Sequence, residues 1–169
     1  VLLTREDFAD RRRFLNARNA MHALLQFGVI PIINENDTVA VDEIKLGDND
    51  NLSALVASLI DAELLILLSD IDGLFTADPR INPDARLIKE IREITPEIEA
   101  LAEDSYSDFG TGGMLSKIKA AKIATEAGIA MAIIDGEKPS DIYGIIDGTG
   151  CAGTFFEPKK HSFTDKNAM

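Results

Sequence analysis

The sequence predicts an α/β protein built around a mostly parallel sheet, with helices on both faces. Short continuous apolar runs, typical of strands buried on both faces, alternate with longer segments whose apolar residues recur at helical spacing. Turn residues separate these segments, as expected of a βαβ arrangement. The 169 residues, 46% of them apolar, suffice for one domain with a sizeable core.

The first part of the chain predicts one helix followed by one strand. Thr4, with acidic residues close behind it, is a helix N-cap, and the apolar side of that helix ends at Gly28. Residues Val29–Ile33 are short, continuous and rich in β-branched side chains, which predicts a strand buried on both faces. Between Asp37 and Gly47, apolar residues stand among acidic ones, as in a hairpin arm or an ordered loop.

Helices and strands alternate along the rest of the chain. The predicted helices cover Leu52–Ile60, Pro96–Ala102, Met114–Ala127 and a short segment that opens at Pro139. The predicted strands cover Leu64–Leu68, Ala130–Ile134 and Gly153–Phe156, the last of which closes the sheet. A long loop from Ser69 to Asn82 is marked by Asp-Gly, Asp-Pro and Asn-Pro pairs, and loops of this length in compact domains are usually functional or disordered.

The charge balance excludes some partners. With 17 basic and 29 acidic residues the net charge is -12, the wrong sign for binding nucleic acid or an anionic membrane surface.

A lone cysteine, Cys151, cannot form an internal disulfide. No apolar run approaches membrane-spanning length and no signal-peptide pattern opens the chain, so a cytoplasmic protein is expected.

Three clusters of short polar side chains mark candidate ligand-binding loops. The run Gly47–Ala54 opens a helical pattern, where free N–H groups and the positive helix end attract a carboxylate or phosphate. Asn34–Asp37 and Ser69–Asp70 each follow a short apolar run, as loops do at the carboxyl ends of parallel strands. The alternative for the first cluster is an N-cap with solvated acids.

A glycine cluster, Gly110–Gly113, precedes Lys117 by one helical turn. Consecutive glycines let backbone N–H groups approach a polyphosphate, and Lys117 can reach the same group. The cluster matches neither the P-loop nor the dinucleotide-binding pattern, so a plain turn is the alternative. Lys119 and Lys122 are interpreted as solvated helix charges.

No metal site is predicted. The Asp-rich runs at Asp48–Asn51 and Asp70–Gly73 lack the glycine and closing glutamate of a calcium loop. His22 and His161 lie far apart in sequence, and no Cys/His spacing suggests zinc. No serine has the setting of a hydrolase nucleophile.

Four of these motifs, in this order, resemble the amino acid kinase family, and within it the kinases that act on glutamate: Asn34–Asp37, Gly47–Ala54, Ser69–Asp70, and Gly110–Met114 with Lys117. Sister kinases acting on acetylglutamate, aspartate, carbamate or uridylate share the layout but not the first two motifs. The resemblance covers residues 1–158 and implies the carboxyl-terminal portion of a kinase domain, whose full sheet has eight mostly parallel strands sandwiched by helices. Residues 159–169 form a polar tail.

The resemblance implies transfer of a phosphoryl group from ATP, with Mg²⁺, to the γ-carboxylate of L-glutamate, the first step of proline synthesis. It also implies proline as a feedback inhibitor and a homo-oligomer. An ionised carboxylate is already a nucleophile, so the chemistry needs positioning and charge neutralisation rather than a general base. Two alternatives are another acyl-phosphate-forming amino acid kinase and a non-catalytic small-molecule sensor on the same fold.

Site residues follow from the resemblance position by position. The glutamate-binding residues are Asn34, Asp37, Asp48 and Asn49. Asp50 is the organising aspartate that holds catalytic lysines, and Lys117 meets the transferring phosphate. The ATP contacts are Ser69, Asp70, Thr111, Gly112, Gly113, Met114, Leu115, Ser116 and Lys117. Because the family's amino-terminal portion supplies a further glycine-rich loop and a second phosphate-binding lysine, residues 1–169 alone are expected to be inactive.

Overall fold

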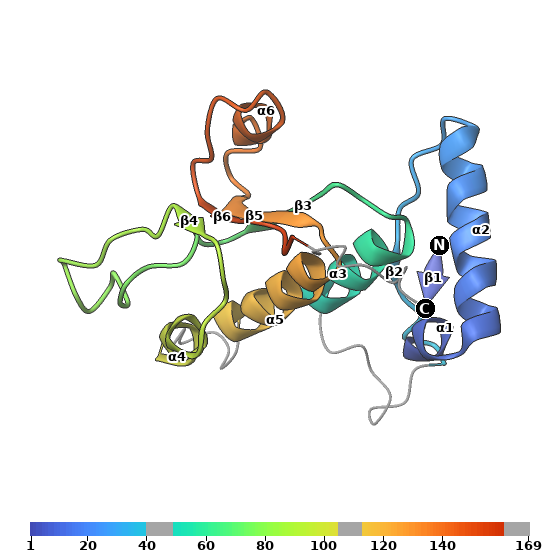
Figure 1. Cartoon of the computed structure of the whole chain (residues 1–169), viewed down its shortest axis with the longest axis horizontal. Helices are drawn as coiled ribbons and strands as arrows, with labels where there is room; N and C mark the ends of the chain where they lie inside the picture. The colour runs from blue at the N-terminus through green and yellow to red at the C-terminus, as the bar shows by residue number, and fades with distance from the viewer. Residues whose placement is uncertain (40–48, 105–112, 161–169) are drawn as a thin grey trace, which may run out of the picture.

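The computed structural model describes residues 1–39, 49–104 and 113–160 (Figure 1). The elements run in the order β1 (Leu2–Leu3), α1 (Arg5–Ala9), α2 (Arg11–Gln26), β2 (Asn34–Glu35), α3 (Asn49–Leu59), β3 (Leu64–Ser69), β4 (Glu90–Ile91), α4 (Pro96–Asp104), α5 (Gly113–Glu126), β5 (Ala130–Asp135), α6 (Asp141–Ile146) and β6 (Thr154–Phe156). None of the helices in these ranges is long and apolar enough to cross a membrane.

The larger sheet has the strand order β3-β5-β6-β4. β3 is parallel to β5 and β4 is parallel to β6, whereas β5 and β6 are antiparallel. The predicted mostly parallel sheet is thus confirmed. The strand predicted at Gly153–Phe156 is found as β6, which lies between β5 and β4 rather than at an edge of the sheet. Gly153 allows this, since a Cβ there would stand 1.8 Å from the carbonyl oxygen of Ile133.

Helices α3 and α5 lie side by side and cover one face of the sheet, and α6 lies on the other side (Figure 1). Small residues line the contact between α3 and α5, which lets the two helices approach closely. These buried residues are Ala54 and Ala57 of α3 and Ala120, Ala121 and Ala124 of α5. Their helical spacing gives each helix one apolar stripe that faces the core.

The single helix predicted after Thr4 is two helices. Asp10 ends α1 and begins α2 with an extended backbone, φ -86° and ψ 121°. Its carboxylate accepts a hydrogen bond from the backbone N–H of Arg13 at 2.9 Å. Aspartate competes for such N–H groups better than it continues a helix, so the chain breaks there.

The strand predicted at Val29–Ile33 is also wrong. The paired strand, β2, begins at Asn34 and is parallel to β1. Val29, Ile30 and Ile32 are 46%, 87% and 86% exposed rather than buried. Within the described ranges β1 is the strand that pairs here. Ile33 packs against a cluster that includes Met21 of α2 and Leu52 of α3, but the other apolar side chains of this run stay largely exposed, so its apolar composition alone does not bury it.

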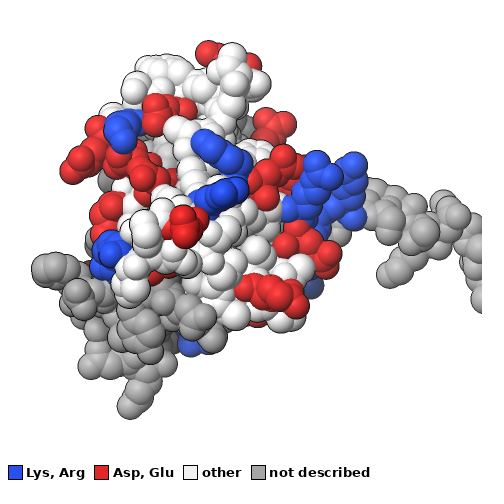
Figure 2. Space-filling view, turned by 90° about the vertical axis from the view of Figure 1, so that its left-hand side faces the viewer, with Lys and Arg blue, Asp and Glu red and all other residues white. Residues whose placement is uncertain are grey.

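Residues 70–89, here called the arm, leave the carboxyl end of β3 and extend away from the sheet (Figure 1). Its two legs are joined by an antiparallel bridge between Phe75 and Leu87. The backbone N–H of Thr76 donates to the carbonyl of Arg86 at 2.9 Å. The face on this side of the molecule carries acidic and basic side chains interspersed, with no field of a single sign (Figure 2).

Candidate active site

The first turns of α3 and α5 meet at one carboxylate. Lys117 Nζ donates to Asp50 Oδ2 at 2.9 Å, and Ser116 Oγ donates to the same oxygen at 3.2 Å. Asp50 lies in the first turn of α3, and the other two residues lie near the start of α5. The packing of α3 against α5 therefore brings together residues that are 66 and 67 positions apart.

The Lys117–Asp50 pair is largely withdrawn from water. The two side chains are 13% and 22% exposed, whereas other ion pairs of the described residues, such as Arg13–Glu6 at 48% and 58%, lie at the surface. In such a partly buried pair, each charge depends on the other for compensation. Asp50 thus holds the Lys117 ammonium in a defined place at the helix ends.

The start of α5 is suited to an anion. A helix N-terminus presents backbone N–H groups and the positive end of the helix dipole. α5 has no acidic residue in its first turn, whereas α3 has Asp50 there. Gly113 is exposed, and a Cβ built on it would meet nothing within 4 Å. A phosphate could therefore approach the backbone of α5 beside Lys117.

The parallel strands β3 and β5 end side by side, and Ser69 is in register with Asp135. Ser69 Oγ donates to Asp70 Oδ1 at 3.0 Å, and the backbone N–H of Gly136 donates to the Ser69 carbonyl at 2.7 Å. The pKa of Asp135 is held below its ordinary value because its carboxylate accepts a hydrogen bond from the backbone N–H of Glu137 and another from the Lys138 ammonium. Ser69 and Asp70 thus lie at the carboxyl ends of the parallel strands, which is where open α/β sheets bind ligands.

The residues predicted to bind glutamate come from two neighbouring elements. Asn34 lies in β2 and Asp37 follows it, and both side chains are exposed. Asn49 is the first residue of α3 and is also exposed. β2 lies against α3, so these elements are adjacent in space. The predicted residues Asp48, Thr111 and Gly112 lie outside the described residues.

One of the predicted ATP contacts faces inward. Met114 is 6% exposed and belongs to the core beside α3, and Leu115 is half-buried. Met114 could therefore contact a ligand only through its backbone.

No metal centre is formed by the described side chains, since no three His, Cys, Asp or Glu residues among them come together. The carboxylate of Asp50 is already engaged by Ser116 and Lys117. This donor set fits a Mg²⁺ ion carried mainly by the phosphates of a nucleotide, since such ions take few protein ligands.

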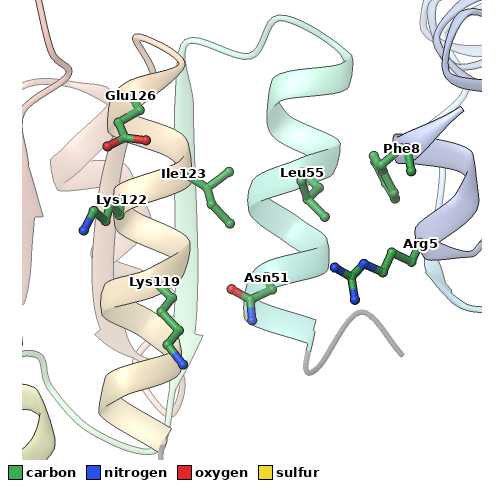
Figure 3. A pocket seen from close by; sticks show the side chains of 9 residues that line it. Arg5, Phe8, Asn51, Leu55, Lys119, Lys122, Ile123 and Glu126 are labelled. Atoms are coloured by element: carbon green, nitrogen blue, oxygen red, sulfur yellow. The ribbon is translucent and has the colours of Figure 1, made fainter. Parts of the chain in front are cut away.

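An open pocket of about 640 Å³ lies between α1, α3 and α5 (Figure 3). Its lining includes Arg5, Phe8, Leu55, Lys119 and Ile123. None of the predicted site residues lines it, so this pocket is separate from the Asp50–Lys117 pair.

Three residues that hold the arm beside Ser69 and Asp70 were not predicted from the sequence: Gly73, Gly153 and Thr154. Thr154 is fully buried and bonded to the arm, and the two glycines allow the close approach. In sequence the glycines look like ordinary turn markers and Thr154 like an ordinary strand residue. Only the contact between the arm and β6 in the structure shows that these residues hold the arm in place.

The fold is α/β, and its described residues bring a lysine and a carboxylate together near the N-terminal ends of two helices. Residues 1–135 match the model of the amino acid kinase family, and the chain belongs to that family. It is 55% identical over 162 residues, 96% of this chain, to the glutamate 5-kinase of Geobacter metallireducens. It is 58% identical over 160 residues, 95% of this chain, to the glutamate 5-kinase of Carboxydothermus hydrogenoformans. The chain spans 43% and 42% of these relatives, less than half of their length.

Solved structures share the fold. A carbamate kinase from Giardia lamblia bound to AMP-PNP is 25% identical, with a TM-score of 0.59, and the match covers 83% of this chain and 44% of that one. The UMP kinase from Ureaplasma parvum is 16% identical, with a TM-score of 0.57, over 83% of this chain and 52% of that one. These likenesses confirm the predicted fold class.

Proposed function

We propose that this chain takes part in the ATP-dependent phosphorylation of the γ-carboxylate of L-glutamate, which yields L-glutamyl 5-phosphate for proline biosynthesis. The Lys117–Asp50 pair at the start of α5 is the observation that carries this proposal. The identity of 53–58% to proteins named glutamate 5-kinase, over nearly the whole chain, supports the choice of substrate.

In the proposed reaction a γ-carboxylate oxygen of glutamate attacks the γ-phosphorus of ATP, and the bond from that phosphorus to the β,γ-bridging oxygen breaks to release ADP. No proton need be removed from the nucleophile. Lys117 contacts the transferring phosphoryl group, and its ammonium offsets charge that spreads over the phosphoryl oxygens. Asp50 and Ser116 position it. Mg²⁺, held by the nucleotide phosphates, supplies further charge neutralisation when bound.

The nucleotide contacts in this proposal are Ser69 and Asp70 at the end of β3, and the backbone of α5 from Gly113 to Ser116. The AMP-PNP bound to the Giardia carbamate kinase supports ATP as the donor, because that protein shares this fold at 25% identity.

Asn34, Asp37 and Asn49 would hold glutamate. The carboxylate of Asp37 suits the substrate ammonium, and the two amides suit its carboxylates. Feedback inhibition by proline, a homo-oligomeric state and a cytoplasmic location belong to the same proposal.

A coupled assay tests the function. Because the chain spans 43% of the Geobacter relative, the assay compares residues 1–169 with a chimera in which the unmatched portion of that relative is joined to them. Acyl phosphate is trapped as the hydroxamate with glutamate, acetylglutamate, aspartate or carbamate as the acceptor. The chimera should form hydroxamate with glutamate and release ADP in equal amount. A preference for another acceptor, or no acceptor-dependent ADP release, would refute the proposal.

A further inference from the structure

One buried hydroxyl joins both legs of the arm to the sheet. Thr154, the first residue of β6, is fully buried. Its Oγ1 accepts a hydrogen bond from the backbone N–H of Leu74 at 2.9 Å and donates one to the carbonyl of Ile88 at 2.7 Å. Leu74 and Ile88 lie on opposite legs and are bonded to each other, Ile88 N–H to Leu74 carbonyl, at 2.8 Å.

Two glycines bring the root of the arm, which is its first residues 70–74, directly against β6. Gly73 has φ +154°, and a Cβ on it would lie 2.5 Å from Thr154 Oγ1. A Cβ on Gly153 would lie 2.5 Å from the carbonyl oxygen of Asp72. Side chains at either position would force the root away from the sheet, so the contact between Thr154 and Leu74 depends on both.

The hydroxyl is what distinguishes Thr154 from a packing residue. Valine has nearly the same shape and suits a strand equally well. At this position, however, valine would leave the buried N–H of Leu74 and the partly buried carbonyl of Ile88 without their bond to the hydroxyl, and such loss is more unfavourable than a bond is favourable. The threonine therefore serves the hydrogen bonds and not merely the core.

The hydrogen bond from the Leu74 N–H to Thr154 restrains the segment that carries Asp70. At one end the Ser69 carbonyl is held by the N–H of Gly136, and at the other end the Leu74 N–H is held by Thr154. Residues 70–73 span these two fixed points. Leu74 is also 1% exposed and Ile71 packs against the core, so loss of the hydroxyl would remove one of several restraints on the span, and the Asp70 carboxylate within it would be less firmly placed.

We propose that Thr154 is a positioning residue for the nucleotide, acting through the arm root on Ser69 and Asp70. This inference rests on the proposed function, in which these two residues contact ATP. It predicts that removal of the hydroxyl weakens ATP binding and leaves glutamate binding and the phosphoryl-transfer step intact.

The test uses Thr154→Val and Thr154→Ser in the chimera. Thr154→Val should raise the KM for ATP and the Kd for AMP-PNP ~10-fold, with the KM for glutamate and kcat at saturating ATP essentially unchanged. Thr154→Ser, which keeps the hydroxyl, should restore ATP affinity. Thr76→Val is the matched control, because its hydroxyl accepts from Arg86 N–H within the arm, beyond the root, at 3.0 Å. It should leave both KM values unchanged.

Hydrogen exchange supplies a readout that does not depend on catalysis. The Leu74 amide should exchange faster in Thr154→Val and normally in Thr154→Ser. Faster exchange with unchanged ATP affinity would reduce Thr154 to a structural role and overturn the inference, as would unchanged exchange. If Thr154→Val does not fold, Thr154→Cys carries the test, because its weaker donor and acceptor should give a smaller rise in the KM for ATP. Normal AMP-PNP binding without glutamate phosphorylation would instead overturn the proposed function, and the AMP-PNP comparison would still decide this inference.

Discussion

Two similar apolar runs of this chain have opposite surroundings. Ala130–Ile134 lies in β5, between β3 and β6 and against α5, and Met131, Ala132, Ile133 and Ile134 are fully buried. Val29–Ile33 has Ile30 and Ile32 87% and 86% exposed. Both runs have the composition of a strand. Whether their side chains are buried depends on the elements that pack against them.

The same difference divides the candidate site. Lys117 and Asp50 come from helices that cover the sheet, and their contact is formed in this chain. Asn34 and Asp37 follow the exposed run, and their side chains are exposed. We therefore expect the phosphate-binding half of the site to be preformed and the glutamate-binding half to depend on what covers residues 29–33.

The largest effect is expected for Lys117→Ala in the chimera. Its kcat should fall ~10²–10³-fold, the usual loss when one transition-state charge contact is removed, with a small change in the KM for glutamate. Lys119→Ala is the control, because Lys119 lies on the same helix but is exposed and is placed outside the site. Steady-state kinetics that leave kcat near normal for Lys117→Ala would remove this lysine from the phosphate site.

The two apolar runs can be compared directly by truncation. In the chain of residues 1–169, Ile133→Ala should lower the free energy of unfolding by about 2–5 kcal/mol, because it opens a cavity in the core. Ile32→Ala should change it by less than about 0.5 kcal/mol, because that side chain is already in water. Urea titrations check both values. Similar losses for the two variants would mean that residues 29–33 are covered in solution.

A smaller effect is expected in the glutamate-binding half. Asp37→Ala and Asn49→Ala should each raise the KM for glutamate in the chimera, since loss of one hydrogen bond to a charged group costs about 1.5–3 kcal/mol. Initial rates at varied glutamate and varied ATP separate the two substrates. If ATP saturation shifted while glutamate saturation did not, these residues would serve the other ligand.

The smallest effect is expected at Asp135, the last residue of β5. The pKa of Asp135 is lowered in the folded protein by the N–H of Glu137 and by Lys138. Its ionised form therefore adds stability above the unfolded-state pKa, and this contribution is lost as the pH falls through the lower folded-state pKa. Melting temperatures between about pH 2 and 6 should fall less steeply on acidification for Asp135→Asn than for the unsubstituted protein. Parallel curves would contradict this assignment.

Local sequence patterns predicted the helices and strands correctly where these elements pack into the core, as α5 and β5 do. The predicted helix at Met114–Ala127 and strand at Ala130–Ile134 agree within a residue or so with α5 and β5, because periodicity, a glycine stop and tertiary burial all favour the same structure there. The prediction failed at Val29–Ile33, where nothing in the run itself reports whether a neighbour lies beside it.

The site was predictable to the level of its residue types. The polar and glycine clusters indicated Asp50 and Lys117, but the contact that Lys117 and Ser116 both make with Asp50 required the packing of α3 on α5. Thr154 could not be predicted, because its two partners, Leu74 and Ile88, lie 80 and 66 positions away and no local pattern records such contacts.

The most direct experiment compares the activity and the association state of residues 1–169 alone with those of the chimera. Among the described residues, the cluster around Asp50 brings one lysine, Lys117, to the proposed phosphate site. Ile30 and Ile32 leave an apolar stretch in water that favours pairing with other chains. We expect residues 1–169 to form no glutamyl hydroxamate and to self-associate on size-exclusion chromatography, and the chimera to be active and monodisperse. Robust glutamate-dependent turnover by a monodisperse chain of residues 1–169 would contradict it.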